Sequence, residues 1–329
     1  MITIKVSNLT VDDYASLIIK SNGNYKSPMK RIDDWLAKNT RHRDRALFNY
    51  LKKNLHRIIK AKPMELEMII QEFDSKGYQS RILKPKNKTL NKTGLAIKDV
   101  FGYDRFRGSA RAVWLSEKLN IKSCTYCNTQ YSLTVARKGK TKLLFHLDHF
   151  FSQDKYPYLS LSFFNLLPCC SSCNMSKSNK AFNLKEDIHP YVDSLDQIAV
   201  FEADHSSLVE FLLNINKNKI KLLLGLRAKH YGDTKKQKKL DNYNEQFKIE
   251  AMYDQFNDVV AETYLKSLFY NKYKRQELVD FFKKNYGEVL SDEMIKRFVT
   301  GNYMESKDLL KRPLAKMMKD ICEDFYPYF

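Results

Sequence analysis

The chain has 329 residues and a formal net charge of +19, from 57 Lys and Arg against 38 Asp and Glu. Hydrophobic residues make up 43% of it, which excludes a chain that is disordered by composition. We expect two or three structural units packed together, since globular domains hold ~100–200 residues each. A cationic excess of this size is typical of a protein that binds a polyanion, with nucleic acid the first candidate and an anionic membrane surface the second.

The sequence lacks the features of a membrane or secreted protein. No apolar run reaches the ~18 residues that are needed to span a bilayer. The first residues, MITIKVSNLTVDDY, include Asp12 and Asp13 and have no continuous apolar segment, so they do not resemble a signal peptide. We therefore expect a cytoplasmic protein with no membrane partner, in which cysteines stay reduced.

Helical periodicity dominates residues 1–119, and basic residues fill many of the polar positions. Apolar residues recur at near-helical spacing over 28–60, which predicts a helix there. Pro63, at a first turn, predicts a second helix through about Phe73. A further helix is predicted over 106–119. We interpret this part of the chain as a basic helical N-terminal region.

The pattern changes after residue 129. Residues 131–135 alternate apolar and polar side chains, which predicts a strand. The sequence RKGK at 137–140 is typical of a hairpin turn, and LLFHLDHF at 143–150 predicts the return strand. A short helix is expected over 173–182. Together with the motifs described below, these features define a core unit over 120–190.

The rest of the chain is predicted to begin with strands and to end with helices. Two strands are expected within 199–224 around a turn at 216–218, and the basic run KKQKK at 235–239 predicts a boundary. Ser291 is a predicted N-cap. Helices are predicted over 247–273, 276–286, 291–299 and 308–325. These elements divide the remainder into a small β appendage with a basic linker, 191–240, and a C-terminal helical region, 241–329.

Five of the six cysteines lie within one short segment. Cys124 and Cys127 form one pair with a two-residue gap, and Cys170 and Cys173 form another. In a reduced protein this pattern predicts zinc bound by four thiolates, because the short gap lets a tight turn direct both sulfurs at one ion. Cys169 competes for the second pair, but only Cys170 keeps the gap. The alternative is ordinary buried cysteine.

A zinc ion with four cysteine ligands has no open position for water, so it can support folding but not catalysis. Any catalytic activity of the protein must come from other side chains. Asp148 and His149 end the predicted return strand, and Asn174 and Lys177 share one face of the predicted helix. Neutral imidazole can act as a general base, and the oxygens of Asp148 and Asn174 suit a hard ion such as Mg²⁺. Lys177 is expected to contact a phosphate or the transition state.

In order along the chain, CTYC, LDHF, NLLPC and CSSCNMSK resemble the motifs of the HNH (ββα-metal) nuclease family. The match covers about 124–180. It implies an α+β fold, with a small ββα-metal zinc-knuckle core inside a mostly helical protein. It also implies hydrolysis of phosphodiester bonds with structural Zn²⁺ and catalytic Mg²⁺ or Mn²⁺. By this resemblance His149 is the general base, and Asp148 and Asn174 bind the catalytic metal. Asn165 braces the loop and helps to orient His149.

A second resemblance covers residues 149–195, which include HFFSQDKYPYLSLSFFNLLPCCSSCN and IHPYVDSL. This segment is similar to the nuclease subunits of Septu-type anti-phage systems and to related HNH proteins of defence islands. The similarity implies a role in anti-phage defence. It also implies an ATPase partner of the ABC or AAA type.

Three basic stretches flank the core unit. Residues 20–60 hold 12 Lys or Arg against three Asp, 81–111 hold nine against two Asp, and 217–239 hold nine against one Asp. They predict contacts with the DNA backbone, which position a duplex without specifying its sequence. For any one stretch, a solvated helix face is the alternative.

The sequence therefore predicts Mg²⁺-dependent cleavage of DNA with low sequence specificity. One site of this kind cuts one strand at a time, so a double-strand break would need a homodimer or two events. Two other interpretations remain open. One is an RNA- or tRNA-directed nuclease toxin, and the other is a non-catalytic zinc-bound module that binds nucleic acid.

Overall fold

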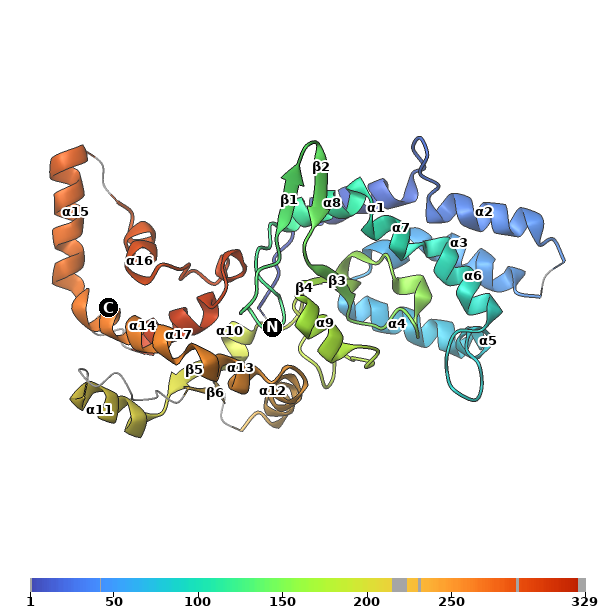
Figure 1. The fold of residues 1–329 in the computed structure, drawn as a ribbon. Coiled ribbons are helices and arrows are strands. Elements are labelled where there is room, and N and C mark those ends of the chain that lie inside the picture. Colours follow the sequence, from blue (N-terminus) through green and yellow to red (C-terminus); the bar gives the residue numbers. More distant parts are fainter. Residues whose placement is uncertain (1, 42, 215–223, 230–231, 288–289, 325–329) are drawn as a thin grey trace. The chain divides into compact units, whose positions relative to one another are not determined.

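The structure, a computed structural model, is a mixed α+β chain in which helices predominate (Figure 1). It describes residues 2–41, 43–214, 224–229, 232–287 and 290–324. The chain forms two compact units, which we call the N-terminal unit (4–121 and 132–185) and the C-terminal unit (1–3, 122–131 and 186–329). Within the described residues, no helix is long and apolar enough to cross a membrane.

The N-terminal unit begins with helices whose apolar faces share a core. They are α1 (Asn8–Ile19), α2 (Pro28–Lys38), α3 (Arg45–Lys60), α4 (Pro63–Ser75), α5 (Tyr78–Ile82), α6 (Lys92–Phe101), α7 (Tyr103–Arg107) and α8 (Ala110–Leu119). Leu47, Leu51 and Leu55 recur every fourth residue along α3 and are fully buried. Burial of each of these side chains stabilises the folded state by ~1.5–3 kcal/mol. The α4 helix confirms the prediction from Pro63.

The single helix predicted over 28–60 is wrong, because α2 ends at Lys38 and α3 begins at Arg45. The guanidinium of Arg45 donates hydrogen bonds to the carbonyls of Leu36 (2.5 Å) and Asn39 (3.1 Å). These bonds supply donors for carbonyl groups at the end of α2, where the helix has no further N–H groups to offer. Leu36 and Leu47 are 11 residues apart, which is about three helical turns. The apolar period therefore stays in phase across the break and conceals it. Likewise, the helix predicted over 106–119 is divided between α7 and α8.

Four short strands follow, namely β1 (Thr134–Arg137), β2 (Lys140–Leu143), β3 (His146–His149) and β4 (Leu166–Cys169). The predicted hairpin turn is confirmed, since β1 pairs with β2 and both Lys138 (φ 49°) and Gly139 (φ 74°) adopt left-handed backbone conformations. The single return strand predicted over 143–150 is wrong. The β2 strand ends at Leu143, and β3 pairs instead with β4. Pro168 made β4 difficult to predict, since proline is rare in strands.

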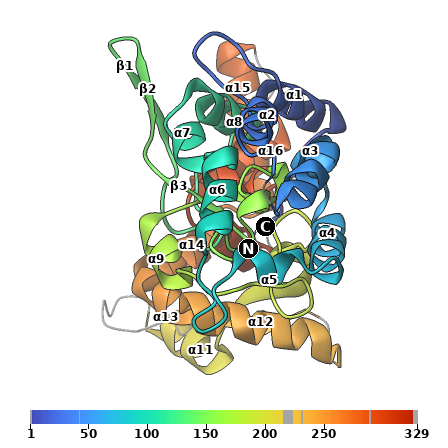
Figure 2. The same cartoon turned by 90° about the vertical axis from the view of Figure 1, so that its right-hand side faces the viewer.

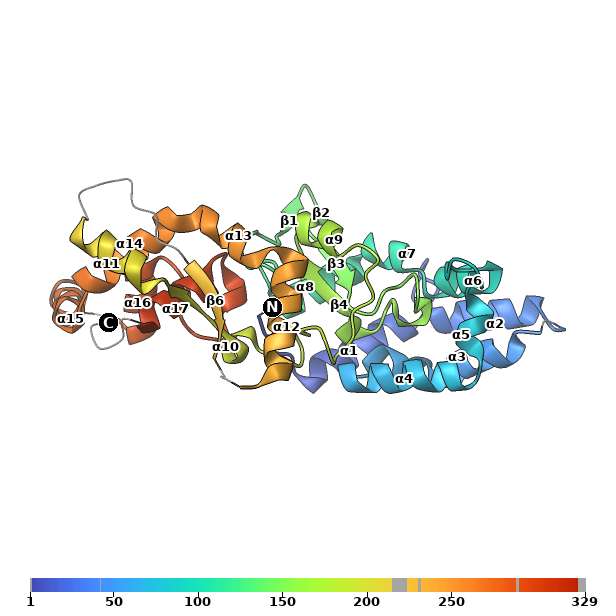
Figure 3. The ribbon, with the colours of Figure 1, turned by 90° about the horizontal axis from the view of Figure 1, so that it is seen from below.

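Helix α9 (Ser171–Lys177) follows β4 directly and packs against β3 (Figures 1 and 3). The 3-10 turns η1 (Pro157–Leu159) and η2 (Phe163–Asn165) lie in the connection from β3 to β4. Two antiparallel strands and a helix therefore come together in one small substructure of the N-terminal unit.

The C-terminal unit contains a two-stranded sheet, in which β5 (Ala199–Ala203) pairs antiparallel with β6 (Leu224–Ala228). The expected two strands within 199–224 are wrong in extent, because helix α11 (His205–Leu213) intervenes and β6 begins only at Leu224. The side chain of Asp204 accepts a hydrogen bond from Ser207 N and caps α11. The turn predicted at 216–218 lies outside the described residues.

The other elements of the C-terminal unit are helical. They are α10 (Leu195–Ile198), α12 (Thr234–Phe247), α13 (Ile249–Tyr253), η3 (Asp254–Phe256), α14 (Asn257–Phe269), α15 (Lys272–Tyr286), α16 (Asp292–Thr300), η4 (Leu309–Lys311) and α17 (Ala315–Asp324). The basic run 235–239 lies within α12. The continuous helix predicted over 247–273 is wrong, because Lys248 (φ 52°) ends α12 and a 3-10 turn precedes α14. The N-cap predicted at Ser291 is confirmed by its hydrogen bond from Met294 N.

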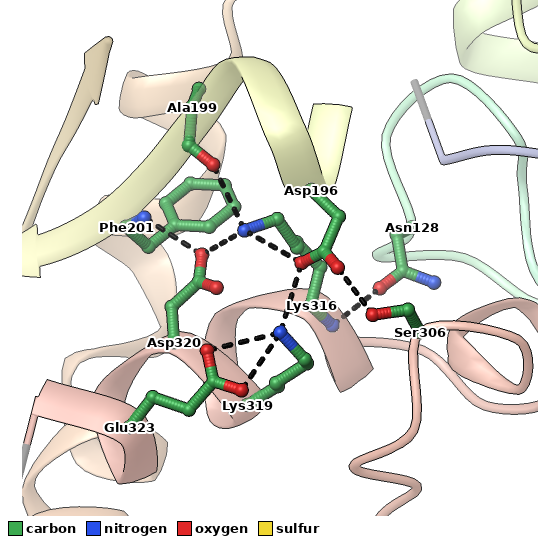
Figure 4. Close-up of polar contacts among 9 residues, drawn as sticks. All are labelled: Asn128, Asp196, Ala199, Phe201, Ser306, Lys316, Lys319, Asp320 and Glu323. Atoms are coloured by element: carbon green, nitrogen blue, oxygen red, sulfur yellow. Dashed lines mark hydrogen bonds and ion pairs between the residues drawn. The ribbon is translucent and has the colours of Figure 1, made fainter. Parts of the chain in front are cut away.

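A buried charge network fixes α17 to β5 (Figure 4). The ammonium of Lys316, which is 1% exposed, forms an ion pair with Asp320 and donates a hydrogen bond to Ala199 O (3.0 Å). The Asp320 carboxylate also accepts a hydrogen bond from Phe201 N (2.8 Å). The network continues to Asp196, Ser306, Lys319 and Glu323.

Replacing Lys316 tests the energetic importance of this network. We expect Lys316→Met to lower the free energy of unfolding by about 3–5 kcal/mol, because it leaves a buried carboxylate without its cation. The double variant Lys316→Met/Asp320→Asn should regain much of this loss, since the amide oxygen can still accept from Phe201 N. Denaturant titration measures both. Lys266→Met, which removes an exposed ion pair with Glu262, is the control and should cost under ~1 kcal/mol. Equal losses for Lys316→Met and Lys266→Met would contradict the prediction.

Candidate functional site

The four paired cysteines form one buried cluster. The sulfur atoms of Cys124, Cys127, Cys170 and Cys173 all lie within 4.8 Å of one another. A tetrahedral zinc ion with Zn–S bonds of ~2.3 Å holds its sulfurs about 3.8 Å apart, so the cluster fits such an ion. The prediction that these cysteines come together is confirmed, and they could bind a metal such as zinc. Cys169 lies outside the cluster, as the two-residue spacing predicted, and burial raises the pKa of its thiol well above the ordinary value.

Local hydrogen bonds shape the first cysteine pair. Asn128, in a left-handed conformation (φ 55°), donates its backbone N–H to Cys124 O (2.9 Å), which closes a tight turn. The backbone N–H and the hydroxyl of Thr129 lie 3.4 and 3.2 Å from the sulfur of Cys127. Hydrogen bonds to a ligand sulfur orient it and favour the thiolate that metal binding requires.

A cavity of about 430 Å³ lies in the N-terminal unit beside β3 and α9. Asp148 and His149 line it from β3, and Asn174 and Lys177 line it from α9. The pairing of β3 with β4 and the packing of α9 on β3 bring together these side chains from distant parts of the sequence. Four of the five predicted reactive residues therefore face one cavity. Tyr103, His146, Ser152 and Gln153 also line it.

His149 has a fixed orientation in this cavity. Its side chain is buried, and Nε2–H donates a hydrogen bond to Ser160 O (2.9 Å). Because a carbonyl can only accept, the proton belongs on Nε2 and the lone pair on Nδ1. Burial lowers the pKa of the His149 imidazole to about 4, against the opposing effects of Ser160 O and Asp148. The ring is therefore neutral at pH 7, and Nδ1 can accept a proton.

Lys177 lies in the interior, where it connects α9 with β3. The side chain is 1% exposed, and its ammonium donates a hydrogen bond to His149 O (2.6 Å). It also forms an ion pair with Asp148 Oδ2 (3.2 Å) and lies 4.9 Å from the centre of the Phe182 ring. These contacts position the backbone of His149 and the carboxylate of Asp148. The contact of Lys177 with a phosphate stays a prediction.

Asn165 is fully buried and braces the connection from β3 to β4. Its Oδ1 accepts a hydrogen bond from Phe151 N (2.7 Å), and its Nδ2 donates to Phe151 O (3.1 Å) and Leu159 O (3.0 Å). These bonds fix the segment next to Ser160, the residue whose carbonyl orients His149. Asn165 therefore connects the two ends of this loop, and its part in catalysis stays a prediction.

Two further residues contribute to this site, Tyr103 and Ser160, neither of which the sequence predicted. The hydroxyl of Tyr103 donates a hydrogen bond to Leu147 O, and its ring lies edge-on to the His149 ring, with centroids 4.4 Å apart. Ser160 contributes only its backbone carbonyl. No motif marks either residue, because a carbonyl is present at every position and Tyr103 precedes the first cysteine pair by about 20 residues.

Ion pairs occupy some of the cations in the first basic stretch. Lys52 pairs with Asp33 (2.6 Å), and Arg57 pairs with Glu65 and Glu72 (2.8 Å each). The charge that this stretch can offer to a polyanion is therefore smaller than its count of basic residues implies. Its contacts with DNA stay a prediction.

Comparison of the chain with protein-family models, curated proteins and solved structures found no match. The cysteine cluster and the cavity must therefore support a function through their own geometry.

The cysteine cluster predicts a measurable metal content. We expect about one zinc ion per purified chain, and we expect Cys127→Ser to lose it, because three thiolates bind zinc more weakly than four. Cys169→Ala, which removes a buried cysteine outside the cluster, is the matched control and should keep its zinc. Elemental analysis of the purified variants measures the stoichiometry. Full zinc occupancy and normal folding in Cys127→Ser would rule out the four-cysteine site.

The buried position of Lys177 predicts a stability effect that a surface phosphate contact would not produce. We expect Lys177→Met to lower the free energy of unfolding by about 3–5 kcal/mol, because Asp148 loses its buried partner. Lys180→Met removes an exposed lysine three residues further on and should change stability little. Urea denaturation of both variants makes the comparison. Similar stability in the two would contradict the positioning role.

Proposed function

We propose that this protein is a metal-dependent endonuclease of the HNH type, which hydrolyses phosphodiester bonds in DNA with low sequence specificity. The observation that carries the proposal is the single cavity lined by Asp148, His149 and Asn174. These side chains occupy the motif positions for the catalytic metal and the general base. They come from separate elements that only the folded chain brings together.

The local architecture supports the same proposal. The β3 and β4 strands pair antiparallel, α9 follows them, and the cysteine cluster includes Cys170 and Cys173 at the start of that helix. This order of two strands, a helix and a knuckle agrees with the ββα-metal core that the motifs imply. A zinc ion there would stabilise the fold around the site without taking part in the reaction.

His149 has the geometry of a general base. Its Nε2–H is held by Ser160 O, which leaves Nδ1 to accept a proton from an attacking water molecule. Asn165 fixes the segment that carries this carbonyl, and Lys177 holds the backbone carbonyl of His149 itself. The imidazole is therefore held in place before substrate binds, so little ordering remains for the reaction step.

The cavity also offers oxygen ligands for a hard cation, namely the carboxylate of Asp148 and the amide oxygen of Asn174. When bound there, Mg²⁺ or Mn²⁺ would supply charge neutralisation at the phosphate and at the leaving oxygen. Lys177 keeps the Asp148 carboxylate in a fixed position beside the cavity.

The biological setting is a further part of the proposal. The similarity of residues 149–195 to Septu-type nucleases supports a role in anti-phage defence together with an ATPase partner. The net charge of +19 is consistent with a nucleic-acid substrate.

Cleavage of supercoiled plasmid tests the proposal. We expect purified protein to cut with added Mg²⁺ or Mn²⁺ and not without it, and His149→Ala to cut about 10²–10⁴-fold more slowly. His146→Ala is the matched control, because His146 lines the same cavity but is exposed and contacts Ser171. It should cut at a rate close to that of the unaltered protein. Gel analysis of nicked and linear plasmid gives the rates.

Three outcomes would count against the proposal. If His149→Ala cut as fast as the unaltered protein, the assignment of the general base would be wrong. Preferential digestion of RNA or tRNA in parallel assays would instead favour an RNA-directed nuclease. Metal-independent binding without cleavage of either nucleic acid, also in the presence of an ATPase partner, would favour a non-catalytic module.

A further inference from the structure

The β1–β2 hairpin projects from the helices of the N-terminal unit (Figure 2). Its base is anchored on α8, where Thr134 and Ser116 share a hydroxyl hydrogen bond of 2.6 Å and Leu143 is buried. The backbone N–H of Leu144 donates to Leu133 O (2.8 Å), which extends the ladder at this end. The tip, at Lys138 and Gly139, is exposed. The hairpin is therefore an anchored ribbon with a free end.

The two faces of this ribbon differ in character. Val135 pairs with Lys142, and the neighbouring position on the same face of β2 is Lys140. Thr134 pairs with Leu143, and these two residues lie on the opposite face, which packs on α8. Lys138, Lys140 and Lys142 are all exposed. The face that points away from the helices is therefore basic.

The charge of the ribbon is not offset by nearby acidic residues in the sequence. Residues 118–147 contain no Asp or Glu, whereas the hairpin 134–143 contains four Lys or Arg. This distinguishes it from the first basic stretch, where Asp33, Glu65 and Glu72 neutralise part of the charge. The lysines of the hairpin are available for an anionic partner.

The ribbon is joined to the candidate catalytic strand by a short, well-held connection. Only Leu144 and Phe145 separate β2 from β3. Helix α7 fixes the backbone of this connection, because Arg107 donates a hydrogen bond to Phe145 O and Tyr103 donates one to Leu147 O. The position of the hairpin is therefore fixed relative to the strand that carries Asp148.

We infer that the β1–β2 hairpin is a DNA-binding ribbon that enters the major groove of duplex DNA and positions one strand at the cavity. This inference rests on the proposed nuclease function and specifies its substrate as double-stranded DNA. The major groove of B-DNA, about 12 Å wide, admits a two-stranded ribbon, whereas the major groove of A-form RNA is too narrow. Strands of four residues span about 13 Å, enough to reach the floor of the groove.

The test compares two variants that lose equal charge. Lys138→Gln/Lys140→Gln/Lys142→Gln alters the hairpin, and Lys272→Gln/Lys283→Gln/Lys284→Gln removes three exposed lysines from α15. Binding to a labelled 30-base-pair DNA duplex, and to one of its single strands, is measured by fluorescence anisotropy at several salt concentrations without added divalent cation. This measurement does not depend on cleavage. Plasmid cutting by each variant is assayed separately.

We expect the hairpin variant to bind the duplex about tenfold or more weakly than the α15 variant. The slope of log affinity against log salt should fall by about one for each phosphate contact that is lost. Affinity for the single strand should fall less, because a single strand offers no groove. Lys138→Arg/Lys140→Arg/Lys142→Arg should retain duplex binding, and this result would show that charge, rather than folding, accounts for the loss.

Equal affinity of the hairpin and α15 variants for the duplex would overturn the inference. An equal loss of affinity for the duplex and for the single strand would overturn it too. Neither result would affect the proposed function if cleavage still required His149. Conversely, if the protein binds the duplex through the hairpin but does not cut DNA, the DNA-binding role of the hairpin is supported and the proposed nuclease function is contradicted.

Discussion

The candidate site depends on one buried interaction, the contact of the Lys177 ammonium with Asp148 and with the carbonyl of His149. An ammonium taken out of water costs several kcal/mol unless its partners are well placed, so this lysine strongly favours one arrangement of α9 against β3. That arrangement brings Asn174 to the wall of the cavity that Asp148 and His149 also line. The same contact therefore sets both the packing of α9 on β3 and the relative positions of Asp148, His149 and Asn174.

A second set of buried polar contacts orients the imidazole. Asn165 uses both ends of its amide on the chain near Phe151 and Leu159, which fixes the carbonyl of Ser160, and this carbonyl accepts from Nε2–H of His149. Buried polar groups that are fully satisfied rigidify their surroundings, because any other arrangement leaves a donor or acceptor without a partner. The proposed hydrolysis with a hard cation rests on these three features, namely a fixed tautomer, a paired carboxylate and a neighbouring amide.

Predictions from the sequence succeeded where local chemistry decides the structure and failed where packing decides it. The hairpin turn at Lys138 and Gly139 and the N-cap at Ser291 depend on neighbouring residues, and both are confirmed. The break between α2 and α3 was missed, because the apolar period stays in phase across it. The pairing of β3 with β4 was also missed, because it joins distant segments and one of them contains Pro168. Strand register across such distances is set by tertiary packing.

The sequence by itself determined the chemical inventory of this protein. It identified Cys170 rather than Cys169 as the partner of Cys173, because metal ligation requires thiolates at a spacing that one turn can bridge. It also singled out Asp148, His149 and Asn174 by their motif positions. Only the tertiary structure decided that Lys177 is buried, that His149 donates to Ser160, and that Tyr103 packs against the imidazole. Burial and hydrogen-bond partners depend on contacts between distant segments, and the spacing of residues along the chain does not predict these contacts.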